Sequence, residues 1–145
     1  MSVEMTRFQF IFPPRAGKLC EAFWNAFEKG VETMSDCLFC KIAAGEIPSK
    51  RAYEDEVCVA FYDIDPQAPT HFLVIPRQHI ASVAEVTEDN AALVGHMLAV
   101  VAKVARDLGL DSYRVVSNCG AQAGQSVNHL HFHVLSGRDM TWPPG

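Results

Sequence analysis

Three histidines alternate with apolar residues near the end of the chain: His129, His131 and His133. In a β-strand successive side chains point to opposite faces, so the alternation predicts three imidazoles on one face and apolar residues on the other. Imidazole changes its charge near neutral pH and can act as a nucleophile or a metal ligand. A half-exposed strand that carries histidine by chance is the alternative, but then the alternation and the loop beside it must both be accidental.

A glycine-rich loop over residues 120–126 precedes these histidines. Glycines such as Gly124 allow close backbone approach, and successive N–H groups in such a loop can hold an anion. Histidines beside an anion-binding loop indicate a phosphate ester or a phosphoramidate as substrate.

A second pattern is the C-x-x-C of Cys37 and Cys40. This pattern can be half of a zinc site, a redox pair or a coincidence, and the redox reading lacks the thioredoxin-like βαβ context that it needs. Zinc needs two more ligands, for which the histidines are candidates. Five cysteines at irregular spacing favour free or metal-bound thiols in a reducing cytoplasm over a disulfide framework.

Size and composition limit what these residues can serve. A chain of 145 residues with 49% hydrophobic residues fits one globular domain. No apolar run reaches about 18 residues, so no membrane span is expected. The net charge of −5 argues against nucleic acid as the main partner, whereas a mononucleotide needs few cationic groups.

The elements that position the histidines can be read from the periodicity. A short helical pattern runs from Cys37 and should end at Gly45. Strands are expected over 57–64, 71–76 and 113–118, with a proline-rich loop over 65–69.

The long helix is predicted to start at a Thr87 cap, with Glu88 and Asp89 in its first turn, and to end at Gly109. Together these elements predict an α+β fold, an antiparallel sheet with one long and one short helix.

Residues 1–34 differ from the rest, and the domain is expected to span 35–145. The segment 19–31 is predicted to form a short helix. It can be a targeting peptide, an additional packing helix or sequence upstream of the true start, and a misassigned start or a loosely docked extension is favoured. Four glutamates balance four basic residues there, which disfavours a mitochondrial presequence.

The motif His-x-His-x-His-x-x resembles the signature of the histidine triad nucleotide-binding proteins. The resemblance covers 37–145, and the segments 61–80, 114–120, 124–127 and 142–145 also carry it. The terminal WPPG looks like the Hint branch, the purine nucleoside phosphoramidases. The resemblance implies a homodimer with a continuous sheet, an AMP-type nucleotide ligand and no cofactor requirement for catalysis.

The same resemblance assigns roles. His131 is the nucleophile that attacks the α-phosphorus and gives a nucleotidyl-histidine, which water hydrolyses. Asp63 matches a ribose-binding carboxylate, although a turn aspartate is the alternative. Phe61 and Ile64 match the base pocket, and Trp142 matches a tryptophan that reaches the partner's site. His71 matches a histidine beside the triad or is a satisfied core histidine. The positions that match contacts to the phosphate or leaving group are Asn118, Gly124, Gln125, Ser126 and His133.

Bacterial relatives with the cysteine pair bind zinc, which implies the ligand set Cys37, Cys40, His79 and His129 here. Two thiolates and two imidazoles make the closed tetrahedral set of structural zinc. This set conflicts with a proton-donating role for His129, so Ser126 or a water would assist departure of the leaving group. Chance co-occurrence of the pattern with spare histidines is the alternative.

Three functions from different classes remain. The first is hydrolysis of AMP-amine phosphoramidates, the second is hydrolysis of dinucleoside polyphosphates, and the third is a non-catalytic nucleotide-binding adaptor. The intact triad speaks against the third, and the Trp142 tail favours the first over the second.

Overall fold

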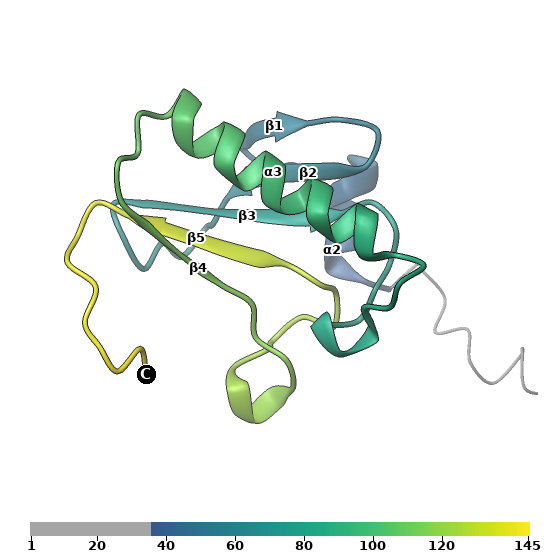
Figure 1. The fold of residues 1–145 in the computed structure, drawn as a ribbon. Helices are drawn as coiled ribbons and strands as arrows, with labels where there is room; N and C mark the ends of the chain where they lie inside the picture. The colour runs from purple at the N-terminus through teal and green to yellow at the C-terminus, as the bar shows by residue number, and fades with distance from the viewer. Residues whose placement is uncertain (1–35) are drawn as a thin grey trace, which may run out of the picture. The chain divides into compact units, whose positions relative to one another are not determined.

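The computed structural model describes residues 36–145, so the expectations for 1–34, including the helix over 19–31, lie outside the described residues. In the described part, five strands form one antiparallel sheet in the order β1-β2-β3-β5-β4 (Figure 1). The strands are β1 (Arg51–Glu54), β2 (Cys58–Tyr62), β3 (Thr70–Pro76), β4 (Tyr113–Val116) and β5 (Phe132–Ser136).

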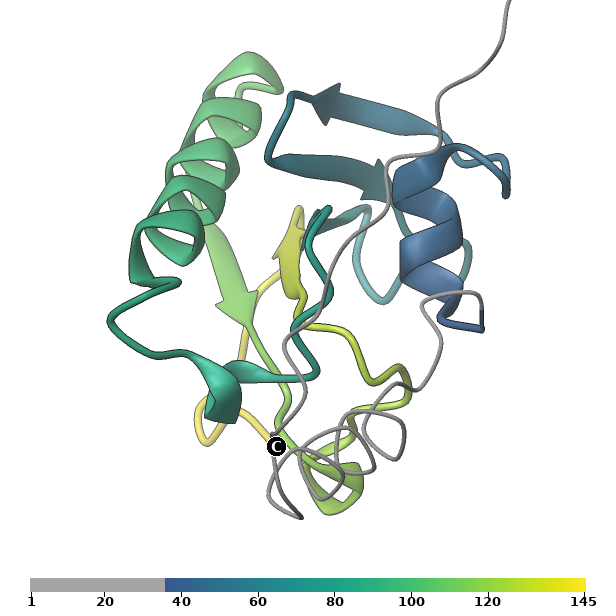
Figure 2. The same cartoon turned by 90° about the vertical axis from the view of Figure 1, so that its right-hand side faces the viewer.

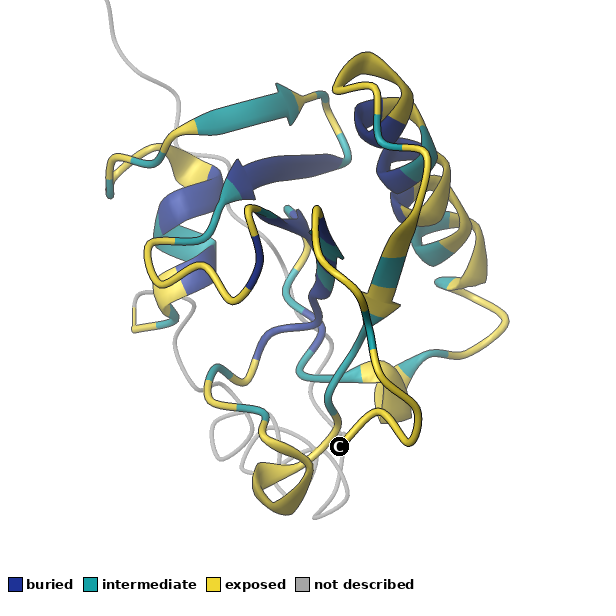
Figure 3. Cartoon of the chain, turned by 90° about the vertical axis from the view of Figure 1, so that its left-hand side faces the viewer, coloured by how far each residue is buried: buried dark blue, intermediate teal, exposed yellow. Residues whose placement is uncertain are grey.

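One face of the sheet packs against the long helix α3 (Ala91–Asp107). Helix residues Met97 and Val101 join Phe72 and Val74 of β3 in one buried cluster. The apolar positions recur at helical spacing, which gives α3 one buried stripe and one exposed side. Figure 3 shows this burial along the inner side of α3 and the exposure of the C-terminal segment.

The opposite face packs against the short helix α2 (Leu38–Ala44). Phe39 and Ile42 of α2 pack against Leu73 and Ile75 of β3, which alternate with the residues that face α3. Figure 2 shows the two helices on opposite sides of the sheet. The predicted α+β fold is therefore confirmed, whereas a dimer with a continuous sheet stays a prediction.

The end of α2 was predicted correctly. Gly45 follows the helix with φ 81°, and its N–H donates to the carbonyl of Ile42. The left-handed conformation favours glycine because a Cβ there meets the following carbonyl. Neither helix of the described part of the chain has the length and apolar character that crossing a bilayer requires.

The predicted start of α3 is wrong. The helix begins at Ala91 with Asn90 at its N-cap, and Glu88 and Asp89 lie in a turn before it. The Oδ1 atom of Asn90 accepts the N–H of Thr87 at 2.8 Å, so this side chain closes the turn that was expected to be helix. Where the first helical turn was predicted, the chain instead forms a turn that the Asn90 side chain stabilises.

The predicted triad strand is only partly regular. Strand β5 begins at Phe132, so His129 and His131 precede it. The N–H of Leu130 donates to the carbonyl of Ile80 at 2.6 Å. The N–H of His129 donates to the carbonyl of Val127, two residues back, at 2.8 Å, so the chain bends over 127–129 before the regular ladder begins. The division of faces nevertheless holds, because Leu130 and Phe132 lie in the cluster under α3.

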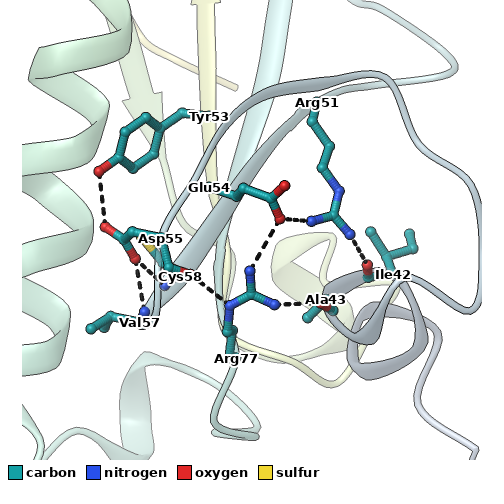
Figure 4. Close-up of polar contacts among 9 residues, drawn as sticks. All are labelled: Ile42, Ala43, Arg51, Tyr53, Glu54, Asp55, Val57, Cys58 and Arg77. Carbon is teal, nitrogen blue, oxygen red and sulfur yellow. Dashed lines mark hydrogen bonds and ion pairs between the residues drawn. The ribbon is translucent and has the colours of Figure 1, made fainter.

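Two arginines hold the C-terminal end of α2 against the sheet (Figure 4). Arg51 donates to the carbonyl of Ile42 at 3.0 Å, and Arg77 donates to that of Ala43 at 2.6 Å. Both guanidinium groups also pair with Glu54. The last carbonyls of a helix lack partners within it, so these bonds satisfy them and fix the helix over the sheet.

Asp55 ties the β1–β2 turn to α3. Its carboxylate accepts the N–H groups of Val57 and Cys58, the Tyr53 hydroxyl, and the Nε2–H of His96 on α3. Burial raises the pKa of Asp55, but the bonds from Cys58, His96 and Val57 outweigh burial and hold the pKa below its ordinary value. The carboxylate form is therefore the one that the fold stabilises.

We expect Asp55→Asn to lower the free energy of unfolding by about 1–3 kcal/mol at pH 7, because the amide loses the charge-assisted bonds. A lowered native pKa contributes stability above the unfolded value of about 4, and that stability is lost as pH falls below it. Urea unfolding at several pH values should therefore show the variant's deficit shrinking in acid. Asp89→Asn, at an exposed turn, is the control. A deficit that stays constant from pH 7 to pH 2 contradicts this account.

Candidate active site

His131 is held by its own chain segment. Its Nδ1 atom lies 2.6 Å from the carbonyl oxygen of His129, and a carbonyl can only accept, so Nδ1 carries the proton. In the neutral ring Nε2 then has a free lone pair. The residue is 4% exposed, which leaves little room for another orientation. This is the hydrogen bond that a nucleophilic imidazole requires.

Phe39 is a site residue that the sequence analysis missed. Its ring meets the His131 ring edge to face at 5.0 Å and 89°. It also meets the Phe61 ring at 5.7 Å. The sequence pattern that could have indicated Phe39 is its position between the two cysteines. At the start of α2 this position faces the sheet.

His129 is completely buried. Its Nε2–H donates to the carbonyl of Pro76 at 2.9 Å, and its Nδ1 lies 3.4 Å from Cys37 Sγ and 3.5 Å from Cys40 Sγ. Burial lowers the pKa of His129 to about 4, so its ring is neutral at pH 7. Both nitrogens are directed away from solvent, which leaves no proton of this ring for a leaving group.

The predicted zinc ligands lie together. The donor atoms of Cys37, Cys40, His79 and His129 are all within 4.8 Å of one another. His79 Nδ1 lies 3.3 Å from Cys40 Sγ. In a tetrahedral zinc site neighbouring sulfur and nitrogen ligands are about 3.5 Å apart, from bonds of about 2.3 and 2.0 Å.

The donor chemistry also fits a metal. His129 presents the unprotonated Nδ1 to the sulfurs while its Nε2–H binds a backbone carbonyl, which is the usual arrangement of a metal-bound histidine. The four residues thus fit a closed site. An ion bound by these residues would connect the start of α2, the segment after β3 and the segment before β5.

The third triad histidine, His133, pairs with His71 on the neighbouring strand. His71 Nε2 lies 2.9 Å from His133 Nδ1, and Asp63 Oδ2 lies 3.5 Å from the same His71 atom. Burial lowers the pKa of His71, and burial followed by the His131 and His71 rings lowers that of His133 to about 4. Asp63 Oδ1 also accepts the N–H of Asp65 at 2.8 Å, so this residue closes a turn as well.

The glycine loop lies beside the triad and is fixed by Gln125. Its Nε2 donates to the carbonyls of Ala81 at 2.7 Å and Val127 at 3.1 Å, and its Oε1 accepts the N–H of Gly120 at 2.9 Å. Three bonds to the backbone occupy the amide of Gln125. Its role in this geometry is therefore to hold the loop in place, whereas the sequence predicted a contact with the phosphate.

The other predicted contacts lie around this loop. Gly124 has φ 90°, and a Cβ there would meet Asn118 Nδ2 at 3.5 Å. Asn118 donates to the carbonyl of Gly124 at 3.4 Å, while Ser126 is exposed.

The predicted base-pocket residues Phe61 and Ile64 differ in exposure, and so does Trp142, which was predicted to reach the partner's site. Phe61 is 5% exposed, but Ile64 is 101% and Trp142 is 83% exposed. Phe61 therefore belongs to the core under α2, and the other two side chains lie at the surface of this chain.

Comparisons with known proteins agree with this geometry. The family described as "HIT domain" matches residues 44–140. An uncharacterized HIT-like protein from Synechococcus elongatus is 50% identical over 111 residues, which is 76% of this chain and 97% of that protein. Protein pkiA from Dictyostelium discoideum is 46% identical over 76% of this chain and 90% of its own length.

Solved structures give the same result. A HIT family hydrolase from Legionella pneumophila has a TM-score of 0.74 and 50% identity, covering 76% of this chain and all of the other (100%). A histidine triad protein from Clostridium difficile has a TM-score of 0.72 and 44% identity, covering 77% of this chain and 97% of the other. The matched segment includes the buried histidines, the glycine loop and the sheet that carries them, and the chain belongs to the HIT domain family.

Proposed function

We propose that this protein is a nucleotide-binding hydrolase that cleaves the P–N bond of AMP-amine phosphoramidates through a nucleotidyl-His131 intermediate. The observation that carries the proposal is the bond from His131 Nδ1 to the carbonyl of His129. It leaves the Nε2 lone pair free and stabilises the positive charge that the ring acquires when Nε2 bonds to phosphorus. Similarity to HIT family hydrolases supports the hydrolase class.

The reaction then has two displacements. His131 Nε2 attacks the α-phosphorus, the P–N bond breaks, and the amine leaves with the electron pair and a proton from Ser126 or water. Water next attacks the phosphorus, the bond to His131 breaks, and AMP is released with the imidazole restored. Because phosphoryl transfer depends on positioning and charge stabilisation, the amides of the glycine loop are the proposed partners of the phosphoryl oxygens.

Dinucleoside polyphosphate hydrolysis is the second candidate, since the same nucleophile would serve a phosphate leaving group. A homodimer in a reducing cytoplasm is the proposed form of the protein. Its support is the unpaired outer side of β4 in the described chain and the exposed Trp142. A solution mass equal to one chain would contradict the dimer.

His131→Ala should lower kcat by several orders of magnitude on a fluorogenic AMP phosphoramidate while nucleotide binding persists, because the nucleophile is lost. In wild-type enzyme denatured at alkaline pH, where the P–N bond of a nucleotidyl-histidine survives, mass spectrometry should find a nucleotidyl group on the peptide that contains His131. Turnover of a diadenosine polyphosphate measured in parallel separates the two enzymatic candidates. Activity of the variant within about tenfold of wild type would exclude His131 as nucleophile.

The Gln125 bonds generate a separate expectation. Gln125→Glu should raise KM for the phosphoramidate by about tenfold or more, because a carboxylate cannot donate to Ala81 and Val127 and the loop loses its shape. Gln122→Glu adds the same charge to the same loop without breaking these bonds, and it should change KM much less. Equal effects of the two substitutions would mean that charge, not loop positioning, is responsible.

We also propose that Cys37, Cys40, His79 and His129 bind one structural zinc ion. The donor distances and the free Nδ1 of His129 support this proposal. Such an ion would hold the short helix, which carries Phe39, against the histidine segment. No catalytic step requires the metal.

Metal analysis of protein purified without an affinity tag should find about one zinc per chain, and a chelator should lower the melting temperature. Cys37→Ser should lose both properties. Cys119→Ser replaces an exposed thiol outside the cluster and should keep them. Less than about a tenth of an equivalent of zinc, with a melting temperature that a chelator does not change, would reject the metal site.

A further inference from the structure

A chain of hydrogen bonds leads from the loop before β3 to the last triad histidine. The backbone N–H of Gln67 donates to His71 Nδ1 at 3.1 Å. His71 Nε2 lies 2.9 Å from His133 Nδ1. The two imidazoles come from adjacent antiparallel strands and lie on the same face of the sheet, since Leu73, two residues after His71, pairs with His133.

The direction of these bonds determines which nitrogen of each ring holds a proton. A backbone N–H can only donate, so His71 Nδ1 must accept, and the proton of the neutral ring sits on Nε2. His71 Nε2–H therefore donates to His133 Nδ1. The single proton of neutral His133 is then on Nε2, away from His71.

The same bonds argue against a metal at this place. Donor atoms of Asp63, His71 and His133 lie within 4.8 Å of one another, as they would around an ion. A metal on His71 Nε2 would move the proton to Nδ1, where it would face the N–H of Gln67 at 3.1 Å. Two donors would then oppose each other in a site where His71 is 5% exposed.

We propose that His71 is a positioning residue that fixes His133 as a neutral donor, with its Nε2–H directed to a phosphoryl oxygen. This inference rests on the proposed function. A protonated His133 would place its Nδ1–H against the Nε2–H of His71, so the pair opposes the imidazolium form. The ring therefore supplies one directed hydrogen bond and is not the acid that protonates the amine.

Charges around the pair are consistent with a neutral His133. The groups that face it are the His131 ring at 4.8 Å between centroids, His71 and the carboxylate of Asp63. Burial and the two rings lower its pKa, and only Asp63 opposes them.

Two substitutions separate hydrogen bonding from packing at His71. His71→Phe keeps a ring of similar size but removes the donor to His133. His71→Gln can place an amide N–H where Nε2 was and so restore the donor. Melting temperatures of both variants report whether the buried position still packs.

In the wild type, long-range proton–nitrogen correlation spectra should show His133 with a proton on Nε2 and a bare Nδ1, and a coupling across the hydrogen bond to His71 Nε2. In His71→Phe the His133 ring should gain charge at higher pH than in wild type. We expect kcat for the phosphoramidate to fall by about 10- to 100-fold with KM nearly unchanged. The kcat of His71→Gln should exceed that of His71→Phe by at least about a tenth of the difference between wild type and His71→Phe.

A wild-type spectrum with the proton on His133 Nδ1, or a charged ring at pH 7, would overturn the inference even if no variant folds. Unchanged kcat in folded His71→Phe would overturn it too. If the protein cleaves no phosphoramidate, the spectra still decide the state of the histidine pair, so failure of the proposed function is distinguishable from failure of this inference.

Discussion

The site depends on the burial of His129. Its ring is fixed between the carbonyl of Pro76 and two sulfurs, and its own carbonyl holds the His131 ring. A polar ring with no exposure must have its hydrogen-bonding groups satisfied, and here these partners come from two other segments of the chain. One buried imidazole therefore connects the start of α2, the end of β3 and the ring of His131.

The rest of the fold keeps that connection rigid. Arg51 and Arg77 hold the far end of α2, so Phe39 stays against His131. Gln125 connects the glycine loop to Ala81, close to His79. The proposed nucleophile, the glycine loop and the proposed metal site are thus held by the same group of contacts. A change at one of them is expected to alter the geometry of the others because packed interiors transmit strain.

Much of this architecture can be predicted from the sequence, because hydrophobic periodicity indicates which face of an element is buried and glycine positions indicate where a helix ends. The end of α2 at Gly45 and the apolar side of the triad follow from such rules. The start of α3 does not, since it depends on how the Asn90 side chain bonds to Thr87. Likewise, the bond from Gln125 to Ala81 and the pairing of His71 with His133 join residues far apart in sequence, which no spacing rule indicates.

The central claim is that His131 Nε2 is the atom that attacks phosphorus. A crystal structure with a non-hydrolysable AMP phosphoramidate analogue tests it most directly. The account predicts the α-phosphorus within about 3–3.5 Å of His131 Nε2, with the P–N bond pointing away in line. An α-phosphate that faces another side chain, or a nucleotide bound away from the triad, would contradict it.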